Sequence, residues 1–323
     1  MSASEIRGPV FLVGCPRSGT TLLKRLLDAH SEVAVAPETH LVRNFWKRRR
    51  DYGELADDRN FGRLLDDIVN LPWFGALGQE AGPFREAALS GTRSLAAPFA
   101  LLFERFAADR GAKWVGEKTP NHLLYMRTLE RLFPDCRFLQ IVRDPRAVAT
   151  SWRALPWSNG SLQKDAEVWR KYQARARALP PRDQDRLLTI RYERLVAEPV
   201  PVLTGVCAFL GLPFESRMLE FHRSVDPGLD LSREPWKQQA THPLSAERAD
   251  RFRQELTDAE IRKIEAVTWF EMRRAAYPPD SALLEALPGV LAAASLRRLT
   301  ALWRRLRKLA RQTRGRWTRE RRA

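Results

Sequence analysis

PVFLVGCPRSGTT, at residues 9–21, joins an apolar run to a helix start through a loop that carries two glycines. Residues 9–14 predict a short buried strand, and residues 20–30 predict the helix that follows, because leucines recur there at helical spacing. Gly14 and Gly19 are separated by four residues, the spacing of loops that fold backbone amides around phosphate oxygens ahead of a helix N-terminus. The segment therefore predicts a phosphate-binding loop within an α/β fold.

The chemistry of this loop differs from that of nucleoside triphosphatases. Thr20 stands where those proteins carry the lysine that reaches the β- and γ-phosphates. A cation lies inside the loop instead, since the planar guanidinium of Arg17 can engage oxygens on a phosphate and a sulfate together. Ser18 and Thr21 add hydroxyl donors. A plain glycine turn would also fit the spacing alone, but the flanking strand and helix and the paired threonines favour the phosphate loop.

The remainder of the chain alternates strand and helix patterns, which indicates a parallel sheet covered by helices on both faces. We expect a P-loop-like three-layer α/β domain over residues 1–280 and a basic helical tail over residues 281–323. Residues 44–112 carry no readable motif, and we interpret them as helices that line an acceptor cleft. Further strands are expected at 113–116, 137–142 and 186–192, and further helices at 123–132, 147–152, 200–210 and 245–270.

Composition places most of the positive charge at the C-terminus. The 323 residues carry a formal net charge of +16 with 44% hydrophobic content, enough to bury a full core. Residues 296–323 hold twelve Lys or Arg and one acidic residue, so the body is only mildly basic. Three cysteines without metal-like spacing argue against a disulfide framework or a structural zinc and favour a reducing compartment. No segment has the length of a signal peptide core or a membrane span.

A second anion-binding pattern follows the strand expected at residues 137–142. Arg143 ends that strand and Ser151 lies eight positions further along, on a helix, so that both side chains could converge on one anion. The alternative is an Arg–Asp pair that caps the helix, with Ser151 on a solvated face. We assign Asp144 and Arg146 to helix capping and surface charge.

The segment Cys15-Pro-Arg-Ser-Gly-Thr-Thr-Leu-Leu23 resembles the 5′-phosphosulfate loop of sulfotransferases that use 3′-phosphoadenosine 5′-phosphosulfate (PAPS). The tyrosylprotein sulfotransferase branch and its bacterial relatives look nearest, and the resemblance extends in pieces from Pro9 to Arg273. It implies that Arg143 and Ser151 bind the 3′-phosphate. It also implies that the sulfate-bearing end of the donor is held by Arg17, Ser18, Gly19, Thr20 and Thr21.

Two further nucleotide contacts are implied by the same resemblance. Tyr192 matches a tyrosine that lies near the nucleotide in the family, although a buried tyrosine at a strand end would explain it nearly as well. Ser232 lies where the family closes a loop over the nucleotide. Lys237 lies in the same segment, but we leave it outside the predicted site because the alignment there shifts by several residues.

Transfer of a sulfuryl group needs an acceptor oxygen in line with the sulfur, a base for its proton, and cations at the bridging phosphate oxygen. The resemblance places Glu38 at the position of the catalytic glutamate and Lys118 at that of a lysine that contacts the leaving bridge. Arg17 would supply the second cation. No carboxylate arrangement resembles a magnesium site, and no metal is expected.

The identity of the base stays open between three residues. Glu38 could instead be the first-turn acid of a helix over residues 41–50. His40 is an alternative base because the ordinary pKa of histidine suits proton transfer near neutral pH. Glu117 could act as a base or could orient Lys118.

Residues 296–323 combine an apolar stripe at helical spacing with arginines on the opposite side, which predicts an amphipathic basic helix. Such a helix would lie on an anionic membrane or pack on the body ahead of an Arg-rich end. No motif supports specific nucleic-acid readout. We expect a cytoplasmic protein, held in the first case at the inner membrane face.

The predicted function is PAPS-dependent transfer of a sulfuryl group to a hydroxyl of a peptide tyrosine, a carbohydrate or a lipid. A P-loop kinase or nucleoside triphosphatase is the first alternative, and it would prefer ATP with Mg²⁺ as its ligand. A membrane- or nucleic-acid-associated protein without enzymatic activity is the second.

Overall fold

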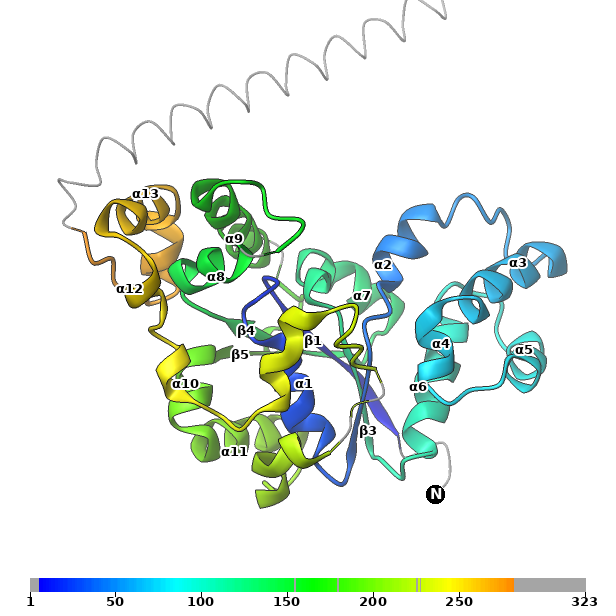
Figure 1. Ribbon diagram of the computed structural model, residues 1–323. Coiled ribbons are helices and arrows are strands. Elements are labelled where there is room, and N and C mark those ends of the chain that lie inside the picture. Colours follow the sequence, from blue (N-terminus) through cyan, green and yellow to red (C-terminus); the bar gives the residue numbers. More distant parts are fainter. Residues whose placement is uncertain (1–5, 154, 179, 225, 227, 282–323) are drawn as a thin grey trace, which may run out of the picture.

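The computed structural model describes residues 6–153, 155–178, 180–224, 226 and 228–281. Five parallel strands form one sheet in the order β2-β3-β1-β4-β5. Helices cover both faces of this sheet, as Figure 1 shows, so the predicted three-layer α/β fold is confirmed. The predicted tail helix at residues 296–323 lies outside the described residues. The strands are β1 (Arg7–Gly14), β2 (Val33–Ala36), β3 (Trp114–Lys118), β4 (Arg137–Val142) and β5 (Leu187–Arg191).

Side chains of the central strand β1 alternate between two cores. Phe11 and Val13 pack into one core, whereas Val10 and Leu12 pack into the other, and all four are fully buried. A parallel strand that is buried on both faces has a continuous apolar sequence, which is why residues 9–14 predict it so clearly.

Each core is closed by its own layer of helices (Figure 1). The layer that packs on Val10 and Leu12 contains α1 (Thr20–Asp28), α10 (Tyr192–Ala197), α11 (Pro199–Leu210) and the 3₁₀ helix η5 (Ser216–Arg223). The opposite layer contains η3 (Pro120–Tyr125), α7 (Met126–Leu132), α8 (Pro145–Arg153), α9 (Leu162–Ala178) and α13 (Asp258–Arg274).

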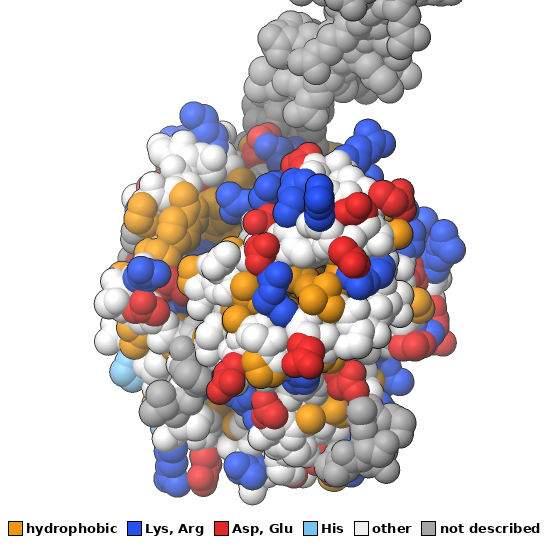
Figure 2. All heavy atoms as spheres, turned by 90° about the vertical axis from the view of Figure 1, so that its right-hand side faces the viewer, with side chains coloured by type: hydrophobic (Ala, Val, Ile, Leu, Met, Phe, Trp, Pro, Cys, Tyr) orange, Lys and Arg blue, Asp and Glu red, His pale blue; other side chains and the backbone are white. Residues whose placement is uncertain are grey.

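A group of short helices extends from the edge of the sheet formed by β2 and β3 (Figure 1). We call these helices, at residues 41–108, the arm; its last helix contacts both β2 and β3. Figure 2 shows this side of the molecule, where basic and acidic side chains are interspersed. The arm consists of α2 (Leu41–Asn44), η2 (Trp46–Arg48), α3 (Asp58–Val69), α4 (Pro72–Ala76), α5 (Ala81–Leu89) and α6 (Ala97–Ala108).

A segment of short helices after α11 runs past the ends of the strands. Within it, η6 contacts α1, η7 contacts α10, and α12 contacts α8. We call residues 228–241 of this region the covering segment. The elements concerned are η6 (Pro235–Thr241), η7 (Ala246–Arg248) and α12 (Phe252–Glu255). Outside this segment, the 3₁₀ helix η4 (Gln184–Arg186) precedes β5.

The predicted helix at residues 41–50 is wrong in its length. α2 ends at Asn44 and η2 begins at Trp46, because Phe45 between them turns into the core and packs edge-on against Phe99, with ring centroids 5.0 Å apart. The sequence pattern also does not predict β2, since four apolar residues carry no readable period.

The assignment of Arg146 to surface charge is also wrong. Its side chain is 2% exposed and forms ion pairs with Asp144 at 2.6 Å, Glu265 at 2.9 Å and Asp280 at 2.9 Å. The capping expected of Asp144 is present, because its carboxylate accepts a hydrogen bond from the backbone amide of Arg146 at 2.8 Å. Arg146 therefore joins α8 to the C-terminal part of the described chain.

Candidate active site

The carboxyl ends of all five strands meet at one edge of the sheet, and each contributes to a common site. Such an edge is where open parallel α/β sheets bind ligands. Glu38 follows β2, Lys118 ends β3, Arg143 follows β4 and Tyr192 follows β5, while the loop at residues 15–19 follows β1. Chain topology therefore gathers residues that lie up to 177 positions apart in the sequence.

The loop between β1 and α1 needs both of its glycines. A Cβ at Gly14 would lie 2.7 Å from the carbonyl oxygen of Ile141, and one at Gly19 would lie 2.6 Å from Cδ2 of Tyr192. Gly19 also has φ 102°, and Arg17 has φ 75°, the left-handed region in which non-glycine residues are uncommon. The left-handed turn at Arg17 brings its guanidinium to the pocket lining.

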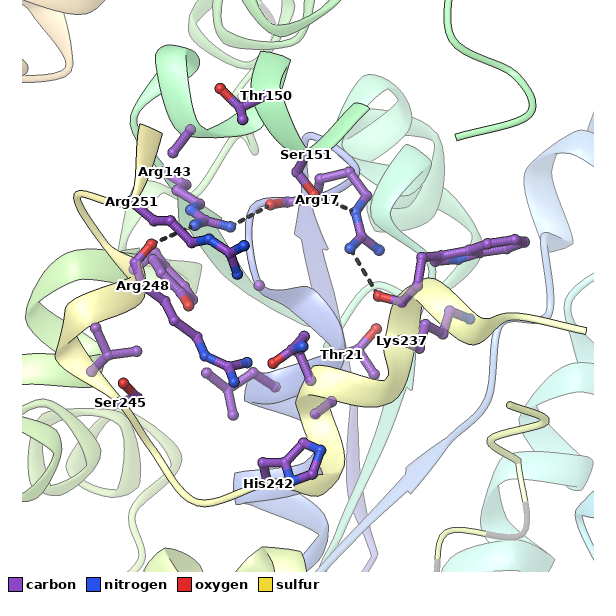
Figure 3. A pocket seen from close by; sticks show the side chains of 18 of the residues that line it. Arg17, Thr21, Arg143, Thr150, Ser151, Lys237, His242, Ser245, Arg248 and Arg251 are labelled. Atoms are coloured by element: carbon purple, nitrogen blue, oxygen red, sulfur yellow. Dashed lines mark hydrogen bonds between the residues drawn. The ribbon is translucent and has the colours of Figure 1, made fainter. Parts of the chain in front are cut away.

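Arg17 and Ser151 lie in direct contact. Nε of Arg17 donates a hydrogen bond to Oγ of Ser151 at 3.0 Å, and Nη2 donates to the backbone carbonyl of Trp236 at 2.9 Å (Figure 3). Burial, together with the positive charge of Arg143, lowers the pKa of Arg17 to about 10. Arg17 forms no ion pair with a carboxylate within the described part of the chain. Its charge is therefore one that a bound anion would stabilise.

Arg143 lies across the pocket from Arg17. Its guanidinium stacks on the ring of Tyr192 at 4.3 Å and donates to the backbone carbonyl of Arg248 at 3.0 Å. Its Nε is buried and has no hydrogen-bond partner among the residues described, and the same is true of Oγ of Ser18. Arg143 lines the cavity, and an unsatisfied donor of this kind in a cationic pocket fits an anionic ligand, whereas Ser18 is fully buried behind the lining.

These groups line a cavity of about 540 Å³. Figure 3 shows Arg143, Arg248 and Arg251 along one side of the hollow and Arg17 with Ser151 on the other. Of the predicted residues, this lining contains Arg17, Gly19, Thr20, Thr21, Arg143, Ser151 and Tyr192. It also contains Lys237, which we left outside the predicted site, and residues that the sequence did not indicate, among them His242, Arg248 and Arg251.

Glu38 lies between two lysines, of which Lys237 lines this cavity. Nζ of Lys118 donates to Oε1 of Glu38, and Nζ of Lys237 donates to the same oxygen at 3.1 Å. Nε2 of His40 lies 3.5 Å from Oε2. Burial alone would raise the pKa of Glu38, but the charges of Lys118 and Lys237 and the hydrogen bond from Lys118 outweigh it and hold that pKa at about 2. Glu38 is therefore a carboxylate at neutral pH.

Glu117 faces away from this cluster and is fully buried. It accepts hydrogen bonds from the backbone and the hydroxyl of Thr39, both at 2.9 Å, and from the hydroxyl of Thr119 at 2.5 Å. His122 contacts its second oxygen at 3.0 Å. Both oxygens are occupied, so the geometry fits a role in holding the turn that carries Glu38 better than a role as a base.

Burial lowers the pKa of His40, although the charges of Glu38 and Glu117 oppose this shift. Its backbone is left-handed, with φ 50°.

Ser232 is not brought to the cavity. Its side chain is exposed, and both its hydroxyl and its backbone amide donate to Asp230, at 2.6 and 3.0 Å. Lys237, five residues further on, reaches the site instead. The resemblance pointed to its segment, and the scarcity of lysine in a chain that strongly favours arginine is a second sequence signal that could have selected it.

Comparison with known families adds to this geometry. A family model described as the sulfotransferase family matches residues 9–216, which is more than half of the chain. The chain belongs to the sulfotransferase family. The match includes the carboxyl ends of all five strands and ends after α11, so it covers the phosphate loop, Glu38, Lys118 and Arg143.

Relatives of this sulfotransferase include animal enzymes. Protein-tyrosine sulfotransferase A of Caenorhabditis elegans is 23% identical over 279 residues, covering 84% of this chain and 68% of that protein. Protein-tyrosine sulfotransferase 2 of Gallus gallus is 26% identical over 233 residues, covering 69% of this chain and 57% of that protein.

Two solved structures share the fold. The sulfotransferase domain from the curacin biosynthetic pathway has a TM-score of 0.60 at 22% identity and covers 85% of this chain and 99% of its own. The sulfotransferase domain of the Synechococcus PCC 7002 olefin synthase has a TM-score of 0.56 at 25% identity and covers 80% and 94% respectively. Both likenesses confirm that the sheet and its helical layers form the sulfotransferase fold.

Within the described residues of this sulfotransferase, no group of three or more His, Cys, Asp or Glu side chains is placed to hold a metal ion. None of the helices among them is long and apolar enough to cross a bilayer. Positively charged side chains at the site include Arg17, Lys118 and Arg143.

Proposed function

We propose that this sulfotransferase binds PAPS in the 540 Å³ cavity and transfers its sulfuryl group to an acceptor hydroxyl, with Glu38 as the base. One observation carries the proposal: Arg17 of the phosphate loop, Arg143 and Ser151 line one cavity, and the Glu38–Lys118 pair lies at the same edge of the sheet. Kinases and triphosphatases are not favoured, because the family match is to sulfotransferases and Thr20 replaces their phosphate-binding lysine.

The donor would be held at its two anionic ends, the 5′-phosphosulfate and the 3′-phosphate. Backbone amides of the loop after β1, with Ser18, Thr20 and Thr21, would hold the 5′-phosphosulfate at the start of α1. Arg143 and Ser151 would hold the 3′-phosphate, and the Tyr192 ring, already stacked on Arg143, would border the nucleotide. Ser232 would join the site only through movement of the covering segment.

In the transfer step, the acceptor oxygen forms a bond to sulfur while the bond from sulfur to the bridging phosphate oxygen breaks. The electron pair of that broken bond stays on the bridging oxygen, which becomes part of the 5′-phosphate of 3′,5′-ADP. Lys118 and Arg17 stabilise the charge that develops there. The acceptor proton moves to the carboxylate of Glu38.

The acceptor would approach Glu38 from the side of the arm. Glu38 leads directly into α2, the first arm helix, and the interspersed charges on this face suit a polar acceptor (Figure 2). The names of the animal relatives make a protein tyrosine the first acceptor to test. One experiment compares protein, carbohydrate and lipid acceptors: the enzyme is incubated with labelled donor and cell extract, the extract is fractionated, and the fraction that carries the label is identified.

A ligand comparison tests the nucleotide assignment. We expect 3′,5′-ADP to bind only the folded state. At a concentration of 100 Kd it should stabilise that state by about 2.7 kcal/mol and thereby raise the midpoint of thermal unfolding. ATP with Mg²⁺ should raise the midpoint far less. Stabilisation by ATP with Mg²⁺ and none by 3′,5′-ADP would contradict the proposal.

We also propose that the enzyme is cytoplasmic and that residues 296–323 attach it to an anionic membrane surface. The support is the sequence pattern alone, an apolar stripe opposite twelve basic residues.

A further inference from the structure

Glu38 is held by two lysines that come from different parts of the fold. Lys118 ends the buried strand β3, and its side chain is 3% exposed. Lys237 lies on η6 of the covering segment, and its side chain is 11% exposed. Both ammonium groups reach the same oxygen, Oε1 of Glu38. The proposed function assigns a task to Lys118 and to Glu38 but none to Lys237.

The task of Lys118 conflicts with its contact to Glu38. If Lys118 stabilises the bridging oxygen of the donor, its hydrogen bond turns toward that oxygen, and its hold on Glu38 weakens. A half-buried carboxylate that loses its cation is destabilised as an anion, so its pKa rises and it turns more freely. A base in that condition would be partly protonated and poorly aimed when it is needed. A second cation that stays in place removes this difficulty.

Lys237 is well placed to be that cation because its segment is fastened close to the donor site. The neighbouring residue, Trp236, accepts a hydrogen bond from Arg17 through its backbone carbonyl at 2.9 Å. Further back, a Cβ built on Gly228 would lie 3.1 Å from the Cβ of Pro37, so the covering segment packs on the residue that precedes Glu38.

The charge of Lys237 is shared between two carboxylates. Its Nζ lies 2.6 Å from Glu234 as well as 3.1 Å from Glu38. Burial alone would lower the pKa of Lys237, but Glu38 and Glu234 raise it above the ordinary value. Lys237 is therefore protonated throughout the physiological range, and Glu234 limits how strongly it depresses the basicity of Glu38.

We propose that Lys237 is a positioning residue that keeps Glu38 ionised and aimed during transfer while Lys118 serves the donor. The proposal rests on the proposed function of Glu38 and Lys118. Because Lys237 belongs to the covering segment, whose backbone also binds Arg17, the base is fully held only when that segment lies over the cavity. Activation of the acceptor is thereby coupled to enclosure of the donor.

The test compares Lys237→Gln with Lys237→Arg and with Lys263→Gln, an exposed lysine on α13 that serves as the matched control. Lys237→Gln should lower kcat about 10- to 100-fold through loss of alignment, with the affinity for 3′,5′-ADP within about twofold of the parent. Lys237→Arg should recover most of kcat, and Lys263→Gln should match the parent in both measurements.

The pH profile separates positioning from mere support of the fold. Glu38 is faced by Lys118 from β3, by Lys237 from η6 and by His40 from its own turn. Removing Lys237 raises the pKa of Glu38. As the pH falls, the Lys237→Gln variant should therefore lose activity at a higher pH than the parent does. The ratio of parent to Lys237→Gln activity should therefore widen as the pH falls from about 7 toward 4.5, the ordinary pKa of glutamate.

A ratio that stays flat with pH, or a Lys237→Gln variant that loses 3′,5′-ADP affinity as well as kcat, would overturn the inference. The second result would make Lys237 a donor-binding residue. A parent enzyme that neither binds 3′,5′-ADP nor transfers a sulfuryl group would instead overturn the proposed function and the inference with it. The parent and the variant thus report on different claims.

Discussion

At the scale of single residues, the described part of the site contains two kinds of cation: those without a carboxylate partner and those paired with a carboxylate. Arg17 and Arg143 contact hydroxyl and carbonyl oxygens, whereas Lys118 and Lys237 contact the carboxylate of Glu38. The first pair is suited to binding the donor, and the second to controlling the base. Substitutions in the two groups should therefore affect different measurements.

We predict that Arg17→Ala weakens binding of 3′,5′-ADP roughly 10- to 100-fold, because it removes charge-assisted hydrogen bonds worth about 1.5–3 kcal/mol. Glu38→Gln should leave that affinity within about threefold of the parent and lower kcat about 10²- to 10⁴-fold, since the amide cannot accept the acceptor proton. Calorimetric titration with 3′,5′-ADP and initial rates of transfer measure the two effects. An equal loss of nucleotide affinity in both variants would contradict the assignment of Glu38 as the base.

At the scale of elements, the buried Arg146 fixes α8, the helix that carries Ser151, against α13. Two of its three ion pairs join the start of α8 to Glu265 on α13 and to Asp280 beyond that helix, and the third is with Asp144. Nearby, Arg153 at the other end of α8 pairs with Glu260, but its side chain is 46% exposed. The same residue type on the same helix thus makes one buried and one exposed contact with the same region.

We predict that Arg146→Met lowers the free energy of unfolding by about 3–5 kcal/mol, because removing one partner of a buried network leaves carboxylates without their cation. Arg153→Met should change it by less than about 1 kcal/mol, as expected for an exposed ion pair. Equilibrium unfolding in urea measures both variants. Similar losses in the two would show that burial of the Arg146 network contributes nothing beyond an ordinary surface pair.

Elements also show which parts of the fold the sequence could predict. The phosphate loop, β1 and β4 were predictable because their signals are local, in residues 9–21 and 137–142. The contribution of Arg248 was not, since it reaches the cavity only through the path of the chain after α11, which no local pattern describes, and the same weak pattern kept Lys237 outside the predicted site. The burial of Arg146 was hidden for the same reason, because its partner Glu265 lies 119 positions away.

At the scale of the whole molecule, charge is divided between the site and the tail. The body carries a small positive excess, and part of it lines the cavity, whereas residues 296–323 hold twelve Lys or Arg. Nucleotide binding as proposed here uses only residues before 282, so the two groups of charges should act independently.

We predict that deletion of residues 296–323 leaves the affinity for 3′,5′-ADP unchanged and abolishes sedimentation with vesicles that contain phosphatidylglycerol. The full chain should sediment with those vesicles and far less with pure phosphatidylcholine, because each Lys or Arg near an anionic surface contributes about 1 kcal/mol. Added salt should weaken the association, since it screens exposed charges. Equal sedimentation of the full and shortened chains would remove the membrane proposal but leave the enzyme intact. Loss of nucleotide binding on deletion would instead show that the tail supports the catalytic body.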